Sequence, residues 1–220
     1  SEVRDLASEL LRPERVEIHV GYTDEFRGND AVTQEALVLP DNEAREQALL
    51  DLLREVPGLE APTHAGEAEA TDLPAHAEKA LVFCTTRDSC DLVYELLQDE
   101  GFSCAALHAQ LGQRERELAL ADFRTGAVRV LAGTDVAARG LDVQGVSLVV
   151  NYEPPHSHSV EDYVHRLGRT GRAGARGRCV TLLGPRDAEQ ARAILEVMQR
   201  TDQVVGPDLE ALAARARGSA

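Results

Sequence analysis

The stretch ALVFCTTRDSCDLVYELLQDEGFSCAAL, residues 80–107, decides the fold. It begins with a short apolar run at 80–84, and a second such run lies at 103–107. Between them, residues 88–99 carry leucine and valine side chains four positions apart, which predicts an amphipathic helix. A strand, a helix and a second strand in this order predict two parallel strands joined by a crossover helix.

The same alternation continues on both sides of this unit. Further strands are predicted at 35–39, 128–132, 146–150 and 178–183. Further helices are predicted at 43–56, 112–124, 160–167 and 187–200. Short apolar strands that alternate with helices predict an α/β fold with a mostly parallel central sheet covered by helices on both faces.

The charge of the chain limits the classes of partner. The 220 residues carry 23 basic and 38 acidic side chains, a net charge of −15, and residues 1–79 alone hold 7 basic and 19 acidic ones. An acidic surface repels phosphate at long range, which excludes a generic basic coat for nucleic acid. The one lysine, Lys79, follows Glu78, so the chain lacks the Gly-Lys-Ser/Thr ending of a phosphate-binding P-loop.

Apolar runs and cysteines indicate the compartment. No run approaches the roughly 20 apolar residues of a membrane helix, and the charged first residues do not resemble a secretory signal. The four cysteines form no CxxC pair, which argues against a zinc site and against a disulfide framework. We therefore expect an intracellular protein, in the cytoplasm or nucleus, with Cys84 buried and inert and His108 in a structural role.

The segment YVHRLGRTGRAG, residues 163–174, is unlike anything a core requires. Together with the residues that follow it, it holds five arginines and no acidic residue: Arg166, Arg169, Arg172, Arg176 and Arg178. Arginines three positions apart project to one side, and the intervening glycines let a ligand approach closely. Because the guanidinium fork suits phosphate oxygens, we favour polyphosphate recognition over a solvated arginine face paired with acidic neighbours.

The segment GTDVAARGLD, residues 133–142, carries complementary groups. Gly140 allows a tight turn, and Asp142 is suited to accept hydrogen bonds from a ribose. Asp135 and Arg139 equally suit a structural salt bridge. We expect both segments to lie beyond the carboxyl ends of strands, where open α/β sheets bind their ligands.

These residues carry a family resemblance. GTDVAARGLD and YVHRLGRTGR resemble motifs V and VI of the DEAD-box RNA helicases, within helicase superfamily 2. LVFCTTR, residues 81–87, resembles motif IV, and Gln113 with Arg116 matches the QxxR motif. The resemblance implies a RecA-like domain, a three-layer α/β/α structure, and specifically the C-terminal one of the family's two.

The resemblance also implies a division of the chain. Residues 1–20 resemble the last helix and strand of the first RecA-like domain, followed by a linker at 21–32, the C-terminal RecA-like domain at 33–200 with an acidic loop insertion at 57–78, and a tail at 201–220. The P-loop, the DEAD carboxylates and the Ser-Ala-Thr motif do not occur in this sequence. The domain that would hold ATP and Mg²⁺ is therefore expected outside this chain, and this half alone is not expected to hydrolyse ATP.

The resemblance assigns roles to individual residues. It implies that Arg169 and Arg172 are arginine fingers for the γ-phosphate of ATP, and that His165 and Arg166 couple the nucleotide state to domain closure. It places the ATP contacts at Gly140, Asp142, Arg169 and Arg172. It places contacts with the RNA sugar-phosphate backbone at Thr86, Arg87, Gln113, Arg116 and Thr134. No metal ligand is predicted in this chain.

Partners follow from the same resemblance. It implies RNA bound without sequence preference, and the N-terminal RecA-like domain of the same protein. The insertions at 57–78 and 153–162 are candidate surfaces for a protein partner; a metal site at His156 and His158 is disfavoured because no third ligand is near in sequence. The alternative function is a non-enzymatic RecA-like module that binds RNA or protein. A DNA-acting relative is disfavoured because YVHRLGRTGR fits the RNA group better.

Overall fold

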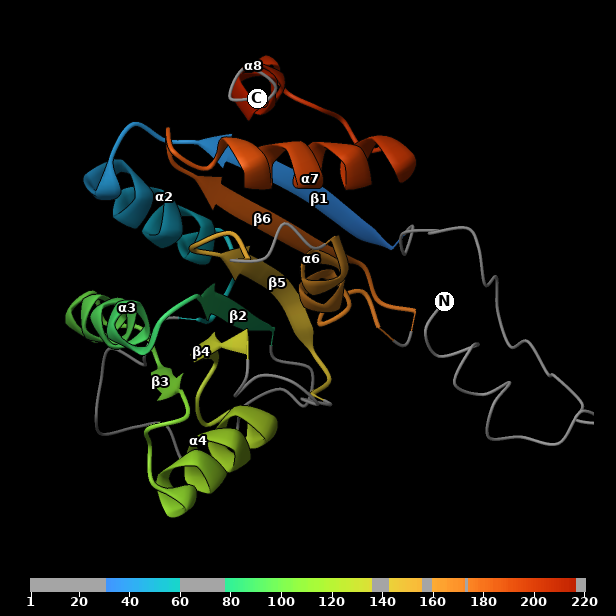
Figure 1. Cartoon of the computed structure of the whole chain (residues 1–220). Coiled ribbons are helices and arrows are strands. Elements are labelled where there is room, and N and C mark those ends of the chain that lie inside the picture. The colour runs from blue at the N-terminus through green and yellow to red at the C-terminus, as the bar shows by residue number, and fades with distance from the viewer. Residues whose placement is uncertain (1–30, 60–77, 136–142, 156–159, 173, 217–220) are drawn as a thin grey trace, which may run out of the picture.

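The computed structural model describes residues 31–59, 78–135, 143–155, 160–172 and 174–216. Its centre is a six-stranded parallel sheet in the order β1-β6-β5-β2-β4-β3 (Figure 1). The strands are β1 (Val32–Val38), β2 (Lys79–Cys84), β3 (Cys104–Leu107), β4 (Val130–Thr134), β5 (Val146–Asn151) and β6 (Gly177–Leu183). The helices are α2 (Asn42–Arg54), α3 (Arg87–Asp99), α4 (Gln113–Thr125), α6 (Val160–Leu167), α7 (Ala188–Arg200) and α8 (Pro207–Arg215).

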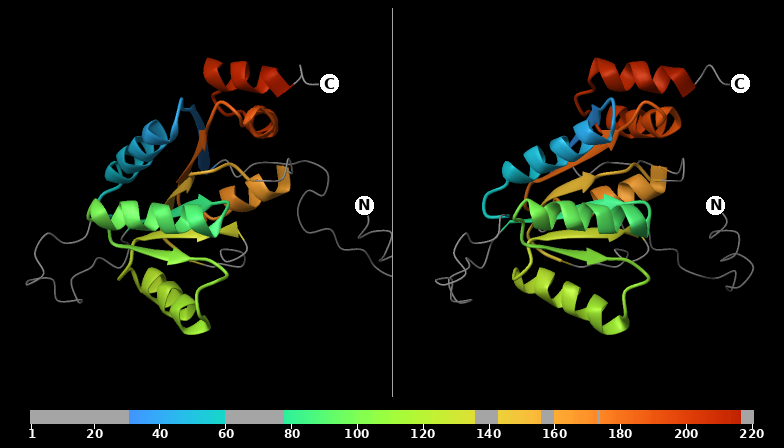
Figure 2. Two further views of the ribbon diagram at one scale, coloured as in Figure 1. Left: turned by 60° about the vertical axis from the view of Figure 1, so that its left-hand side comes forward. Right: turned by 90° about the vertical axis from the view of Figure 1, so that its left-hand side faces the viewer.

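Helices cover both faces of the sheet (Figure 2). The alternating side chains of β2 show the division: Leu81 and Phe83 belong to one apolar cluster and Ala80 and Val82 to the other. The first cluster includes buried side chains of α4, α6, α7 and α8, and the second those of α2 and α3. This arrangement confirms the predicted three-layer α/β/α fold with a parallel sheet.

Helices α2 and α3 begin where a short polar side chain follows a strand. Asp41 accepts a hydrogen bond from the Ala44 amide at 2.9 Å and caps α2. Thr86 caps α3 in the same way, with its hydroxyl oxygen 3.1 Å from the Ser89 amide nitrogen. Each cap satisfies a backbone donor that would otherwise lack a partner in the first turn, and so fixes where the helix starts.

Strand β1 begins earlier than the 35–39 predicted from the sequence. Gln34 lies within β1 and is buried, although a polar residue at this position does not predict a buried strand. The Gln34 backbone amide donates to Gln203 Oε1 at 2.8 Å, and its side-chain amide donates to Thr201 Oγ1 at 3.0 Å. The segment after α7 thus satisfies the polar groups of this edge strand, a contact that local sequence patterns do not reveal.

The end of the chain contributes to the core. Within the predicted tail at 201–220, helix α8 buries Leu209, Leu212 and Ala213 against the cluster that also includes α7 side chains. The proposed remnant at 1–20 and the interior of the acidic insertion, 60–77, lie outside the described residues.

Cys84 is buried, as expected, and so is His108. The ring of His108 is buried with Nε2 2.9 Å from Asp91 Oδ1, a structural contact. Cys84 is buried, and a hydrogen bond with Cys90 together with burial raises its pKa well above the ordinary value. A thiol with a raised pKa holds little reactive thiolate at neutral pH, as expected for an inert cysteine.

Candidate functional site

Arg166, in the last turn of α6, is the most buried charged side chain near the predicted site, with 1% of it exposed. Its Nε and Nη2 donate to the two carboxylate oxygens of Asp135 at 2.7 and 2.6 Å. Its Nη1 donates to Asn151 Oδ1 at 3.2 Å and to the Glu153 carbonyl oxygen at 2.8 Å. One guanidinium therefore fastens α6 to the segments that follow β4 and β5.

The surroundings of Arg166 explain why the charge tolerates burial. Its guanidinium carbon lies 4.9 Å from the centre of the Phe83 ring, a cation–π distance. Asn151 is itself fully buried and held by a 2.8 Å hydrogen bond from its side-chain amide to Thr181 Oγ1. A buried cation is tolerated when its donors are satisfied, and here the Asp135 carboxylate accepts two of the four hydrogen bonds.

Asp135 thus forms a salt bridge with Arg166, which comes 31 positions later in the sequence. The alternative partner considered from the sequence, Arg139, lies outside the described residues. Gly140 and Asp142, predicted to contact ATP, lie outside them as well. The predicted ATP contacts of Gly140 and Asp142 therefore remain predictions.

Arg169 and Arg172 lie half-buried in the loop that follows α6. Arg169 Nε donates to the His165 carbonyl oxygen at 3.2 Å, and Arg172 Nε donates to the Gly168 carbonyl oxygen at 2.6 Å. Burial and the neighbouring charge of Arg172 lower the pKa of Arg169. The two guanidinium groups therefore repel each other and concentrate positive charge at one place on an acidic chain, which favours an anion there.

This arginine loop does not lie where the sequence predicted it. Thr170, in the middle of the loop, donates from its hydroxyl to the carbonyl oxygen of Val146, the first residue of β5, at 2.6 Å. The loop leads directly into Gly177, the first residue of β6. It therefore lies at the amino ends of the strands, and the expectation that it lies beyond their carboxyl ends was wrong. The reason is topological: a crossover helix between parallel strands returns the chain to the opposite edge of the sheet.

Gly177 holds the arginine loop close to the sheet. A Cβ atom at this position would lie 2.1 Å from Thr170 Oγ1 and 2.6 Å from the Gly171 backbone nitrogen. We expect Gly177→Ala to lower the free energy of unfolding by about 1–3 kcal/mol, because backbone would have to move to make room. Urea unfolding measures this change. Gly206→Ala is the control for added bulk, because nothing lies within 4 Å of its Cβ position; since Gly206 is the N-cap of α8, it is expected to cost only the loss of that cap, about 0.5–1 kcal/mol.

The predicted RNA contacts lie at the carboxyl edge of the sheet. Thr86 and Arg87 follow β2 directly, Thr134 is the last residue of β4, and Gln113 begins the helix that follows β3. Because β2, β4 and β3 are neighbours in the sheet, these residues share one edge. The structure thus brings the predicted RNA residues together, on the edge opposite the arginine loop.

Local contacts orient some of these side chains. Arg87 Nε donates to Asp88 Oδ1 at 2.7 Å, and Gln113 donates to Glu117 Oε1 at 2.7 Å; Arg87 and Gln113 are exposed. Arg116 Nε is buried and has no hydrogen-bond partner among the described residues. No three His, Cys, Asp or Glu side chains of the described part of the chain form a metal-binding group. No described helix has the length and hydropathy to cross a membrane.

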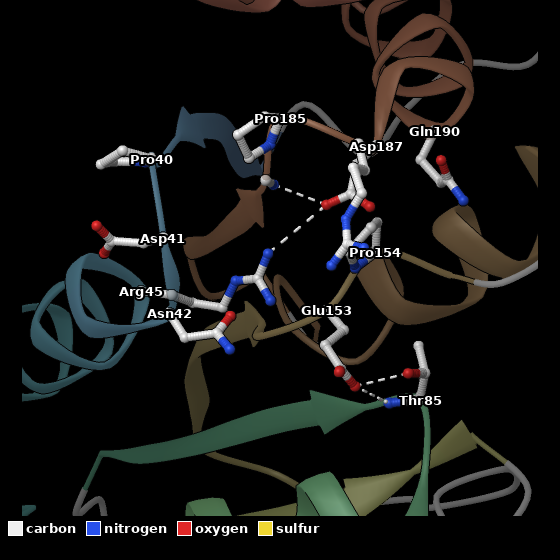
Figure 3. A pocket seen from close by; sticks show the side chains of 12 residues that line it. Pro40, Asp41, Asn42, Arg45, Thr85, Glu153, Pro154, Pro185, Asp187 and Gln190 are labelled. Carbon is white, nitrogen blue, oxygen red and sulfur yellow. Dashed lines mark hydrogen bonds and ion pairs between the residues drawn. The ribbon is translucent and has the colours of Figure 1, made fainter.

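Sequence reasoning missed a hollow of about 420 Å³ at the carboxyl ends of β1, β2, β5 and β6 (Figure 3). Arg45 and Asp187 face each other across it, with an Nη2–Oδ2 distance of 3.7 Å. Below them, Glu153 points at Thr85 and accepts hydrogen bonds from its amide and hydroxyl at 2.8 and 2.6 Å. A polar residue directly after a strand was the available signal, since Glu153 comes two residues after β5.

Comparison with known proteins bears on these motifs. The family model described as the helicase conserved C-terminal domain matches residues 68–174. The chain is 37% identical over 217 residues to DEAD-box ATP-dependent RNA helicase 46 of Arabidopsis thaliana, covering 99% of this chain and 30% of the relative. It is 39% identical over 208 residues to the ATP-dependent RNA helicase dbp3 of Aspergillus niger, covering 94% of this chain and 39% of the relative.

Solved structures agree with the fold. The chain matches Dbp5 of S. cerevisiae, solved with RNA and ADP BeF3, with a TM-score of 0.69 and 26% identity, over 93% of this chain and 47% of that one. It matches the E. coli DEAD-box protein SrmB, solved with the regulator of ribonuclease activity A, with a TM-score of 0.58 and 26% identity, over 81% of this chain and 93% of that one.

The chain spans only about a third of the length of the curated relatives, so its counterpart in them is one domain of a longer protein. The match to the helicase C-terminal model, the parallel sheet and the order of the motifs along it confirm the resemblance seen in the sequence. This chain belongs to the DEAD-box RNA helicase family, as its C-terminal RecA-like domain.

Proposed function

We propose that this chain works as the C-terminal half of an ATP-dependent RNA helicase, supplying arginines for ATP hydrolysis and part of the RNA-binding surface. The observation that carries the proposal is the pair of half-buried arginines, Arg169 and Arg172, whose Nε atoms are held by the His165 and Gly168 carbonyl oxygens at 3.2 and 2.6 Å. Two cations held in one loop favour an anion there, and the polyphosphate of ATP is the anion that relatives of this chain use by name.

In this proposal the two arginines reach the γ-phosphate from one side of a cleft between two domains. The charge that develops on the transferred phosphoryl group is then stabilised by two planar, bidentate donors. The opposite wall, with the P-loop and the Mg²⁺, belongs to an N-terminal RecA-like domain. Gly140 and Asp142, which follow β4 in the sequence, are proposed to contact the nucleotide.

Arg166 and His165 take different parts in this scheme. Arg166 is buried and paired, so we propose that it acts on the nucleotide through the position of α6 and not by direct contact. His165 is exposed on the same helix, and its carbonyl oxygen accepts a hydrogen bond from Arg169. We propose that both residues couple the nucleotide state to closure of the two domains.

We propose that RNA binds along the carboxyl edge of the sheet through its sugar-phosphate backbone. The residues for these contacts are Thr86, Arg87, Gln113, Arg116 and Thr134. Contacts with the backbone carry no base information, so binding without sequence preference is expected, and contacts with 2′-hydroxyls favour RNA over DNA.

The four cysteines are free thiols, which supports an intracellular location.

The proposal predicts that RNA stimulates ATP hydrolysis in a protein that carries this chain together with its N-terminal RecA-like domain. The 220-residue chain alone is expected to show negligible ATPase activity, because it supplies one wall of the cleft. Phosphate release is measured with matched RNA and DNA duplexes. Equal stimulation by DNA would contradict an RNA helicase. RNA binding that is indifferent to nucleotide, with no hydrolysis by the longer protein, would instead support a non-enzymatic binding module.

A further inference from the structure

Glu153 occupies a position where three parts of the site meet. Its carboxylate oxygen Oε2 accepts hydrogen bonds from the Thr85 amide, the Thr85 hydroxyl and the Ser89 hydroxyl, at 2.8, 2.6 and 2.8 Å. Its backbone carbonyl oxygen accepts from Arg166 Nη1 at 2.8 Å. One residue therefore holds the loop after β2 with its side chain and the buried guanidinium of α6 with its main chain.

The loop on the side-chain side carries two of the proposed RNA contacts. Thr85 immediately precedes Thr86 and Arg87. Ser89 is tied to the same loop, since its hydroxyl lies 3.2 Å from the Thr86 carbonyl oxygen and its amide donates to Thr86 Oγ1. By bonding both Thr85 and Ser89, the carboxylate ties the end of β2 to the first turn of α3.

The carboxylate is ionised and half-buried. Burial by itself would raise the pKa of Glu153, but the hydrogen bonds from Thr85 and Ser89 hold it below the ordinary value. Hydrogen bonds to an ionised acceptor are shorter and stronger than those between neutral groups. The link between Glu153 and the loop after β2 is therefore a stiff one at neutral pH.

The main-chain side leads to the arginine pair. Arg166 bonds both Glu153 and Asp135, and Asp135 directly follows Thr134, a further proposed RNA contact. The Arg166 carbonyl oxygen accepts from the Arg169 amide at 3.0 Å, so the arginine loop starts from the same residue. The segments that follow β4 and β5 are thus both bonded to the Arg166 guanidinium, and Glu153 connects the loop after β2 to them. The backbone of Arg166 leads into the arginine loop at the opposite edge of the sheet.

We infer that Glu153 is a positioning residue that transmits the placement of RNA at Thr86 and Arg87, through Arg166, to Arg169 and Arg172. The inference rests on the proposed function. Glu153 touches neither RNA nor nucleotide in this scheme; it holds the loop that touches RNA in a fixed relation to the helix that carries the arginines. The bonds of Glu153 to Thr85, Ser89 and Arg166 are the link on which this relation is proposed to depend.

The experiment uses the protein that carries both RecA-like domains and compares Glu153→Gln, Thr85→Val and the double variant with the wild type. For Glu153→Gln we expect the ATPase rate constant at saturating RNA to fall about tenfold, the usual factor for loss of one good hydrogen bond. The RNA concentration for half-maximal stimulation is expected to change less than about threefold, because the proposed RNA-contacting side chains all remain. The double variant should match Glu153→Gln within about twofold, because both substitutions weaken the same bonds.

Glu35→Gln is the matched control. Glu35 is another half-buried carboxylate, in β1, and it accepts two hydrogen bonds from Arg178 of β6 at 2.6 and 2.9 Å. Glu35→Gln is expected to lower the free energy of unfolding and to leave the rate of RNA-stimulated ATP hydrolysis unchanged. Thr85→Val keeps the carboxylate and its backbone bond, so it provides the test even if Glu153→Gln folds poorly.

Two outcomes separate the inference from the function on which it rests. If Glu153→Gln and Thr85→Val lose stability like Glu35→Gln but hydrolyse ATP with the wild-type rate constant at saturating RNA, Glu153 is merely structural and the inference is overturned. If the wild-type protein shows no stimulation by RNA, the proposed function itself is overturned, and the inference with it.

Discussion

Replacing Arg172 by lysine is expected to reduce the RNA-stimulated ATPase rate constant of the two-domain protein by a factor on the order of 10³. Lysine keeps the positive charge but loses the planar fork that contacts two phosphoryl oxygens at once. It also loses the Nε donor that fastens the side chain to the Gly168 carbonyl oxygen at 2.6 Å. The rate constant at saturating ATP and RNA is the measurement, with the ATP affinity recorded beside it.

A control exists in the same loop. Arg176 is exposed, four residues further along the chain, and carries the same charge. Arg176→Lys is expected to change the rate constant less than about twofold, so a general effect of charge or of loop composition would appear in both variants. Wild-type hydrolysis by Arg172→Lys would remove Arg172 from the proposed chemistry, whatever the control shows.

The fold was predictable wherever neighbours in sequence settle it. In β2 the apolar residues form one continuous run, and in α3 they recur every fourth position, so the local sequence is enough to predict a buried strand and an amphipathic helix. β1 was misplaced because Gln34 finds its partner Gln203 169 positions away. The local sequence pattern does not show a hydrogen bond between residues so far apart, so a polar residue such as Gln34 is predicted to lie in a loop.

The candidate site divides in the same way. Composition revealed the arginine cluster, but Arg166 and Arg169 are chemically alike, and nothing local says which one turns inward. That choice is made by Asp135 and Asn151, which arrive from two other strands. Glu153 was missed for the same reason, because its partners Thr85 and Ser89 precede it by more than 60 residues.

The sequence also predicts the edge of the sheet on which the arginine loop lies. Once 160–167 is predicted as a crossover helix between parallel strands, the loop that follows it has to return to the amino edge of the sheet. The rule that ligands bind at carboxyl edges describes sites made by one sheet alone. In the proposed function a second domain completes the ATP site, so the arginines of this domain need not lie at the carboxyl edge of their own sheet.

The largest loss of stability is expected from Asp135→Ala, which leaves the Arg166 guanidinium buried without its carboxylate. Arg166 is 1% exposed, and Asp135 accepts from two of its nitrogens at 2.7 and 2.6 Å. Removing one partner of a buried pair typically costs about 3–5 kcal/mol, and we expect the lower end because the Asp135 side chain is 30% exposed and water can replace part of it. Urea unfolding of the 220-residue chain measures the change.

The double variant Asp135→Ala/Arg166→Met distinguishes an unpaired charge from a packing defect. Methionine fills much of the space beside Phe83 and carries no charge, so the double variant should recover at least about half of the lost stability. Glu189→Ala breaks the exposed pair with Arg192 and is expected to cost less than about 0.5 kcal/mol. If Asp135→Ala is as mild as Glu189→Ala, Asn151 and Glu153 suffice to hold the buried guanidinium. In that case the carboxylate serves to position α6 and contributes little to the stability of the fold.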